Sequence, residues 1–270
     1  MKISALLFTF FLATAALAQQ TDDLIIPMSG APHILVPAAG DVSGANGTHF
    51  RSDISIINLR NTTQRVQLYW LPQGSSGVAI APVIITLNPQ SGFVSENFAA
   101  NVMNQSGLGS IEVVGVRQDN TFDSAALLHV SARIWTPRPD GAAGTMSQTF
   151  PAIVLSSTEA SVKAIFGMRQ GPQYRLNAGI SNPTESPRRF RVTVVVSPSA
   201  GGTPVQTQFD VDVAAQSMEQ RSVAGTTEGL AQFLIEDITQ PAVVGPWHAW
   251  ASSVDNQSGD AWSQMAVPGS

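Results

Sequence analysis

Apolar and polar residues alternate with a period of two over several short stretches of the chain. The alternation is clearest in residues 83–88, 126–135 and 209–214. Successive side chains of a β-strand point to opposite faces, so this period is typical of a sheet with one buried face. No window of helical length carries an apolar stripe at a spacing of 3.6 residues. The pattern therefore predicts short strands rather than helices.

Turn-forming residues separate these stretches. They occur at Pro72-Gln73-Gly74, Asn88-Pro89, Pro139-Asp140-Gly141, Asn182-Pro183 and Gly201-Gly202. Strands at such spacing, about seven or eight in every 115 residues, favour a sandwich of two antiparallel sheets.

The chain also repeats itself. Residues 50–58 resemble residues 174–182, and residues 66–72 resemble residues 192–198. Further matches follow in the same order: Gly107-Leu108 with Gly229-Leu230, His129 and Ala132 with His248 and Ala251, and Ser147-Gln148 with Ser263-Gln264. A repeat in constant order indicates two copies of one unit. We therefore predict an all-β protein with two tandem, homologous, antiparallel β-sandwich domains of the Ig-like kind.

The first eighteen residues have the features of a secretory signal peptide. Lys2 gives a positive start, an apolar run spans residues 3–12, and Ala16-Leu17-Ala18 fits a cleavage site. The apolar run is shorter than the roughly 20 residues that span a bilayer. We predict cleavage near Ala18, no membrane span, and an extracellular or periplasmic location.

Domain boundaries follow from these assignments. They are a signal peptide at 1–18, an N-terminal segment at 19–32, a first sandwich at 33–155, a short linker at 156–160 and a second sandwich at 161–270. The polar linker Ser156-Ser157-Thr158-Glu159 is too short to allow wide relative motion of the domains.

Composition restricts the chemistry. Cysteine is absent, so neither disulfides nor thiolate metal sites are available, and apolar burial has to stabilise the fold. Charged residues make up 12% of the chain and its formal charge is −5. There is no basic patch, so we do not expect nucleic-acid binding.

At residues 47–58, a strand that begins Gly47-Thr48-His49-Phe50-Arg51-Ser52-Asp53 follows an entry strand at residues 34–39. This sequence resembles a group of bacterial secreted repeat proteins of unknown function, which carry a Gly-Thr-aromatic-x-Thr/Ser-Asp strand before an Asn-Pro turn. Leu59 replaces the turn proline in the first copy, and Asn177 replaces the aspartate in the second. The resemblance implies export and a β-sandwich without implying an activity.

Catalytic signatures are missing from the sequence. It contains no nucleophile elbow, zinc-protease helix, phosphate-binding loop or dinucleotide fingerprint. We predict no catalytic residues, no cofactor and no metal site. The alternative is an extracellular hydrolase whose active residues meet between the domains, which requires an acid pair or a Ser/His pair in a deep cleft.

Polar clusters in the sequence have structural interpretations that we prefer. His129 and His248 occupy equivalent places in the two copies, which indicates a repeated structural role. His49 is expected to form a surface pair with Asp53. The oxygen-rich segments 41–47 and 255–260 are weak calcium candidates that read better as turns.

Aromatic residues are the best candidates for binding. Trp247 and Trp250 are three apart, so one should enter the core while the other faces outward. Trp135 lies on the face opposite Leu128 and Val130. An exposed tryptophan of this kind could stack on a sugar or anchor a protein partner, but we favour the interpretation that it packs under a loop or against the other domain. The candidate binding residues are Trp135, Trp250, Tyr69 and Trp262.

The sequence thus predicts a secreted, non-catalytic structural or binding module. Its expected partner is a protein or a polysaccharide at the cell envelope.

Overall fold

The computed structural model describes residues 30–44, 47–138, 141–156 and 160–269. The predicted signal peptide and the N-terminal segment as far as residue 29 lie outside this part of the chain. The described residues form an all-β protein in which every ladder between named strands is antiparallel. They include no helix that is long and apolar enough to cross a membrane.

We define the N-terminal half as residues 30–156, and its described residues form nine strands and one short helix. They are β1 (His33–Ser43), β2 (His49–Asn58), β3 (Gln64–Pro72), β4 (Val83–Leu87), β5 (Gly92–Ser95), α1 (Phe98–Asn101), β6 (Gly107–Val116), β7 (Leu128–Pro137), β8 (Thr145–Thr149) and β9 (Ile153–Val154).

The C-terminal half, residues 160–269, also contains nine strands. They are β10 (Val162–Gln170), β11 (Tyr174–Asn182), β12 (Arg188–Pro198), β13 (Val205–Val213), β14 (Ser217–Ser222), β15 (Gly229–Asp237), β16 (His248–Asp255), β17 (Ala261–Met265) and β18 (Val267–Pro268).

The strand order of the first half recurs in the second. The C-terminal sheets have the orders β13-β12-β15-β10-β18 and β14-β11-β16-β17. In the N-terminal half the matching orders are β4-β3-β6-β1-β9 and β5-β2-β7-β8. Pairing of β1 with β2 at Asp41, Val42 and Ser43 joins these two arms into one nine-stranded sheet. The same β-bulge also recurs, between Val36 and Ala39 of β1 and between Ile165 and Met168 of β10.

Each half encloses its own core. In the N-terminal half, inward side chains of both arms meet in one cluster that includes Val36, Ile56 and Ile111. In the C-terminal half, Ile165 and Phe233 of one sheet pack with Ile180 of the other. The alternation read from the sequence is therefore the alternation between these cores and the outer faces of the sheets.

Two of the sequence matches are shifted by two residues. Val66 of β3 lies opposite Gly115, and Phe190 of β12 lies opposite Asp237. Gly115 and Asp237 are each eight residues beyond the matched glycines at the starts of β6 and β15. Val66 therefore corresponds to Phe190, not to Val192. A slip of two residues keeps every side chain on the same face, so alternation cannot detect it.

The second shifted match lies in β8 and β17. Arg133 lies opposite Thr149, and Ser252 lies opposite Ser263. Arg133 and Ser252 are each four residues beyond the matched histidines at 129 and 248. Ser263 therefore corresponds to Thr149, two residues beyond Ser147.

The match of Asn58 with Asn182 has a physical basis. The Nδ2 of Asn58 donates to the carbonyl oxygens of Thr62 and Asn88, and the Nδ2 of Asn182 donates to those of Ser186 and Ala214. Each buried amide thereby satisfies two loop carbonyls that would otherwise lose hydrogen bonds on folding.

Candidate functional site

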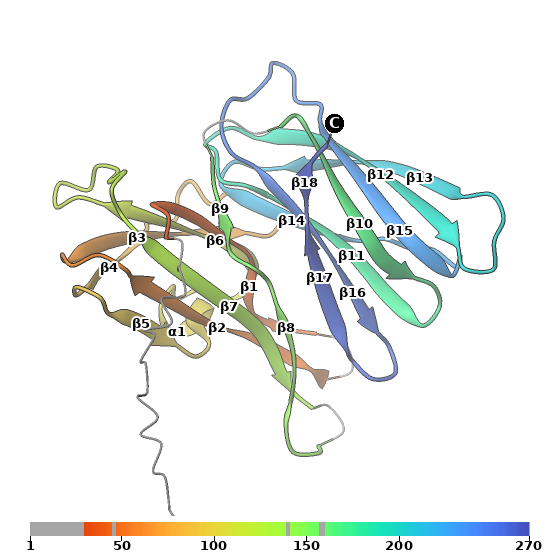
Figure 1. The fold of residues 1–270 in the computed structure, drawn as a ribbon, viewed down its shortest axis with the longest axis horizontal. Helices are drawn as coiled ribbons and strands as arrows, with labels where there is room; N and C mark the ends of the chain where they lie inside the picture. Colours follow the sequence, from red (N-terminus) through yellow and green to blue (C-terminus); the bar gives the residue numbers. More distant parts are fainter. Residues whose placement is uncertain (1–29, 45–46, 139–140, 157–159, 270) are drawn as a thin grey trace, which may run out of the picture.

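The two halves pack face to face through the outer surfaces of their sheets. The N-terminal half contributes β1, β3 and β6, and the C-terminal half contributes β11, β14 and β16. Figure 1 shows the halves side by side, with β17 next to β8 and with β12 and β13 on the far side of the molecule. Ser110 and Ser181 share a hydrogen bond of 2.7 Å between their hydroxyl groups across this junction, and Ser217 Oγ donates to the carbonyl of Pro72 at 2.8 Å.

A small apolar cluster, which we call the junction cluster, lies between the two main cores. Its buried members are Ala38, Phe150, Met218 and Trp250, with Leu108, Ile134 and Met265 packed against them. The rings of Phe150 and Trp250 meet edge to face at a centroid distance of 4.9 Å. Because both halves contribute to this cluster, it holds them in one arrangement.

Trp250 is the centre of the junction cluster, so the favoured interpretation, in which it packs against the other half, is confirmed, and the alternative of a solvent-facing tryptophan is wrong for this residue. Only 1% of its surface is exposed, and its Nε1 donates to the carbonyl of Pro37 at 3.1 Å. It points to the outer face of its own sheet, as the strand period requires, but the N-terminal half covers that face. Trp247, the other member of the pair, enters the C-terminal core as expected.

A groove of about 650 Å³ opens beside the junction cluster and is the candidate functional site. Its apolar wall contains Val42, Phe50, Leu108, Ile134, Met146, Phe150, Trp250 and Val254. Its polar wall contains Arg138, Gln148, Arg175, Asn177, Gln220, Ser252 and the turn at residues 255–259. This combination of apolar walls with a few polar groups is typical of binding sites.

Two sheet edges border the groove. β8 is the last strand of its sheet and β17 is the last strand of another, and both contribute to the lining through Met146, Gln148 and Ala261. The edges touch where Ser263 Oγ donates to the carbonyl of Thr149 at 2.8 Å. Edge strands carry backbone groups without a strand partner on one side, which makes them templates for an added strand.

One polar group in the groove lacks a partner. The Nε2 of Gln148 is buried and makes no hydrogen bond within the part of the chain that the structure describes. A buried amide without a partner costs about 1–3 kcal/mol, so a ligand that accepts a hydrogen bond there would recover part of that free energy.

The groove lining does not have the composition of a hydrolytic site. Among the described lining residues, Asp255 is the one carboxylate and there is no histidine. Asp255 Oδ1 accepts hydrogen bonds from the backbone N–H groups of Gln257 and Ser258, which lower its pKa. These contacts give Asp255 the turn-forming role expected for residues 255–260. The groove therefore offers no support for the hydrolase alternative.

The other three predicted binding residues lie apart from the groove. Trp135 is half-buried on the outer face of β7, where its Nε1 donates to Asp53 at 2.6 Å and two arginines, Arg51 and Arg133, flank its ring. Burial alone would raise the pKa of Asp53, but the hydrogen bonds from Arg133 and Trp135 outweigh it and lower that pKa. The indole of Trp135 thus has a hydrogen-bond partner at its edge and an arginine over its ring from each of two neighbouring positions.

Tyr69 and Trp262 are also half-buried and occupied. Tyr69 donates its hydroxyl to Gln67, and burial together with the negative charges of Glu112 and Glu185 raises its pKa. Trp262 packs against the C-terminal core and meets Tyr174 edge to face. The structure thus places the four predicted aromatic residues in four separate environments and brings none of them together.

The histidines are likewise dispersed. His33 pairs with Glu112, and His49 pairs with Asp41, each at 2.5 Å. The expected pair of His49 with Asp53 is absent, because residues four apart on one strand are about 13 Å apart, whereas Asp41 is on the neighbouring strand. Within the described residues no three His, Cys, Asp or Glu side chains gather closely enough to hold a metal ion.

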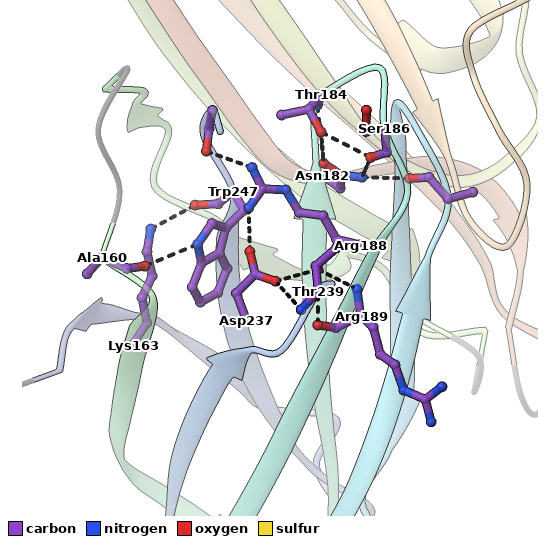
Figure 2. Close-up of polar contacts among 12 residues, drawn as sticks. Ala160, Lys163, Asn182, Thr184, Ser186, Arg188, Arg189, Asp237, Thr239 and Trp247 are labelled. Atoms are coloured by element: carbon purple, nitrogen blue, oxygen red, sulfur yellow. Dashed lines mark hydrogen bonds and ion pairs between the residues drawn. The ribbon is translucent and has the colours of Figure 1, made fainter. Parts of the chain in front are cut away.

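A second hollow, of about 570 Å³, lies at one end of the C-terminal half. It is lined by Arg188, Arg189, Asp212, Glu219 and neighbouring loop residues. Figure 2 shows the polar network beside it, in which Arg188 bonds to Asp237 at 2.5 Å and to the carbonyl of Gly245 at 2.8 Å. Arg188 is already held by these bonds, so the network explains the stability of this end better than it explains binding.

Sequence reasoning missed most of the groove. Phe50 and Gln148 enter the sequence interpretation only as parts of the repeat, and Phe150 matches no motif. Alternation shows which side chains leave a core, but nothing local shows that two outward faces from different halves meet. The sequence does contain one signal, which is a glycine inside a strand at position 179. The structure gives its reason, because a Cβ atom there would clash with the indole of Trp250.

Comparisons with known proteins give no family. No family model matches the chain, and no curated protein matches its sequence. The crystal structure of Thermotoga maritima 1070 is similar with a TM-score of 0.31 and 12% identity, over 41% of this chain and 97% of that chain. Bacteroides uniformis beta-glucuronidase 2, covalently bound to cyclophellitol-6-carboxylate aziridine, has a TM-score of 0.18 and 8% identity, over 82% of this chain and 26% of the glucuronidase. Likenesses at these scores carry no argument about activity.

Proposed function

We propose that this protein is a secreted, non-catalytic binding module made of two homologous Ig-like β-sandwich domains. Its ligand is an extended segment of a protein partner at the cell envelope, held in the groove between the halves. The observation that carries the proposal is the apolar groove bordered by two sheet edges, β8 and β17.

The groove favours a polypeptide over a polysaccharide. Sugars stack on exposed aromatic faces, but Trp250 and Phe150 are buried in the groove wall and present little of their rings. An extended polypeptide has two means of binding here, because its backbone pairs with a strand edge while its apolar side chains enter the groove. Its carbonyl groups are also suitable acceptors for the Gln148 amide.

Selection from a phage-displayed peptide library tests this proposal. The selected peptides are titrated against the wild type, a Val42→Arg variant at the half-buried rim of the groove, and a Val244→Arg control. Val244 is 90% exposed and lies outside the groove. We expect Val42→Arg to weaken peptide binding at least tenfold, because it places a charge at an apolar wall, and Val244→Arg to leave it unchanged. Circular dichroism checks that both variants fold.

Fluorescence supplies a second readout, because Trp250 lies in the groove wall and its emission should shift when a peptide binds. If the selected peptides bind all three proteins equally, the groove is not the site. If no peptide is selected and the protein is instead depleted by insoluble polysaccharides, the partner is a carbohydrate and the proposal is wrong.

A further inference from the structure

The junction covers one outer sheet face in each half, and the two covered faces are not equivalent to each other. Each half therefore leaves uncovered the face that is equivalent to the covered face of the other half. In the N-terminal half, the outer face of β1, β3 and β6 is covered by the outer face of β11, β14 and β16. The equivalent of the first is the outer face of the β13-β12-β15-β10-β18 sheet, which we call the acceptor face. The equivalent of the second is the outer face of β5, β2, β7 and β8, which we call the donor face.

The acceptor face displays apolar side chains at the positions that form the junction in the first half. Pro37 lies in the bulge of β1 and accepts the indole hydrogen bond of Trp250, and its equivalent in the bulge of β10 is Phe166. Leu108 packs against the junction cluster, and its equivalent is Leu230. Phe166 is 57% exposed and Leu230 is 51% exposed.

Two further apolar side chains extend this surface. Leu234 and Val267 lie opposite Ala164 from the two sides, so all three point to the same face of the sheet. Leu234 and Val267 are about half exposed. Large apolar side chains grouped on one face mark an interaction surface, because covering them removes apolar area from water.

The donor face is also uncovered. Val94 of β5 lies opposite Ser55 of β2, and it is 72% exposed. Ile57, two residues beyond Ser55 on β2 and so on the same face, is half-buried and occupies the place that Ser181 has in the second half. Ser181 is the residue that bonds to Ser110 across the junction.

We propose that the acceptor face binds the donor face of a second copy of this chain, in the arrangement that joins the two halves within one. On the donor face Ser131 and Gly92 take the places of Trp250 and Met218, so Val94 and Ile57 supply the apolar contacts of this interface. The chosen occupant follows from the repeat, because the acceptor surface of the first half is already covered by the matching face of the same kind of unit. Such a contact joins two different surfaces, so it leaves one of each free and continues head to tail.

Sedimentation velocity of the mature chain over a range of concentrations tests the proposal. Wild type should form a concentration-dependent ladder of oligomers. Leu230→Arg on the acceptor face and Val94→Arg on the donor face should each yield monomers. Val244→Arg changes a 90% exposed valine in the loop between β15 and β16, on neither face, and this control should assemble like the wild type.

Mixing the two monomeric variants separates the possible geometries. Leu230→Arg retains its donor face and Val94→Arg retains its acceptor face, so the mixture should form one-to-one dimers and nothing larger. At about 0.5 mM, a contact with a Kd of about 1 mM, or a binding free energy of about −4 kcal/mol, still gives detectable dimers. A wild type that stays monomeric up to that concentration overturns the proposal. So does a closed dimer that Leu230→Arg disrupts and Val94→Arg leaves intact, because that result means two acceptor faces pair with each other.

Discussion

At the scale of single residues, the packing of the Trp250 indole depends on the residue opposite it. Gly179 of β11 lies directly opposite Trp250 of β16, and a Cβ atom there would collide with the indole carbons. The missing side chain lets the ring lie flat against the sheet and reach the carbonyl of Pro37. A single hydrogen atom in place of a methyl group thus allows the junction to close.

Gly179→Ala should lower the free energy of unfolding by about 1–3 kcal/mol, because the added methyl group displaces a packed ring. The measurement is urea denaturation followed by circular dichroism. Gly92→Ala is the control: its nearest side-chain neighbour is the flexible Ile57, so we expect a change below about 1 kcal/mol. Equal effects of the two substitutions would contradict the packing described for Trp250.

His248 is a second residue whose environment is set by tertiary packing. It is buried, its Nε2 has no hydrogen-bond partner within the described residues, and Lys163 lies nearby. Burial, with a smaller contribution from the positive charge of Lys163, lowers the pKa of His248 from its ordinary 6.5 to about 3. The native protein therefore keeps this ring neutral at pH values where the unfolded chain protonates it.

This shift predicts a loss of stability in mild acid. The unfolded state takes up a proton below pH 6.5 and the native state does not, so stability is fully present above pH 6.5 and declines as pH falls toward 3. Between pH 7.5 and pH 5 the histidine should account for about 2 kcal/mol. Urea denaturation at the two pH values measures it. His248→Gln should remove most of that difference, whereas His129→Gln, at the half-buried equivalent position, should leave it in place.

At the scale of strands and sheets, the two halves use different side chains to pair the buried polar residue at the start of β3 and of β12. Gln64 and Arg188 occupy equivalent buried positions there. In the first half Gln64 and Asp123 both bond to Arg60, which reaches in from a loop. In the second half the arginine itself is on the strand and bonds to Asp237, which ends β15. The two halves share a strand order, but they do not share the ion pair that forms at the start of β3 and of β12.

Arg188→Gln should destabilise the protein by about 3 kcal/mol or more, because it leaves the Asp237 carboxylate partly buried without its partner. Arg189→Gln is the neighbouring control. Arg189 is exposed and pairs with Asp210 at the surface, where an ion pair contributes less than about 1 kcal/mol. Thermal and urea unfolding of both variants measure the effect, and similar losses for the two would contradict this assignment.

At the scale of the whole molecule, the junction cluster couples two cores that each half already possesses. Its members come from both halves, and Trp250 contributes the largest side chain. Hydrogen bonds from Trp250 to Pro37 and from Ser217 to Pro72 cross the same boundary. We therefore expect the wild type to unfold in one cooperative transition rather than half by half.

Trp250→Ala should separate that transition into two. Removing the ring leaves a cavity in the junction and costs about 3–5 kcal/mol of coupling and packing, while both main cores keep their residues. Differential scanning calorimetry measures the number of transitions. Trp135→Ala is the control, because Trp135 lies on an outer face of the first half. A single transition in Trp250→Ala would show that the junction cluster does not couple the halves.

Local periodicity accounts for the parts of the fold that the sequence predicted well. Alternation reports which side chains leave a core, so the all-β class and many strand positions could be read from residues such as Val83–Leu87. The repeated order of motifs anticipated a strand order that occurs twice. The same period hid the two-residue slips in β3 and β8, because side chains two apart share a face. The signal peptide and the bacterial resemblance remain predictions.

The sequence alone determined the period, the turns and the doubled order of strands, because each depends on residues that are close together in the chain. The tertiary structure alone decided which outer faces are covered, and with them the burial of Trp250 and the position of the groove. Trp250 and Pro37 are joined by a hydrogen bond across more than two hundred residues. A face that points away from its own core looks the same in the sequence whether it meets water or the other half, because its burial depends on a surface far along the chain.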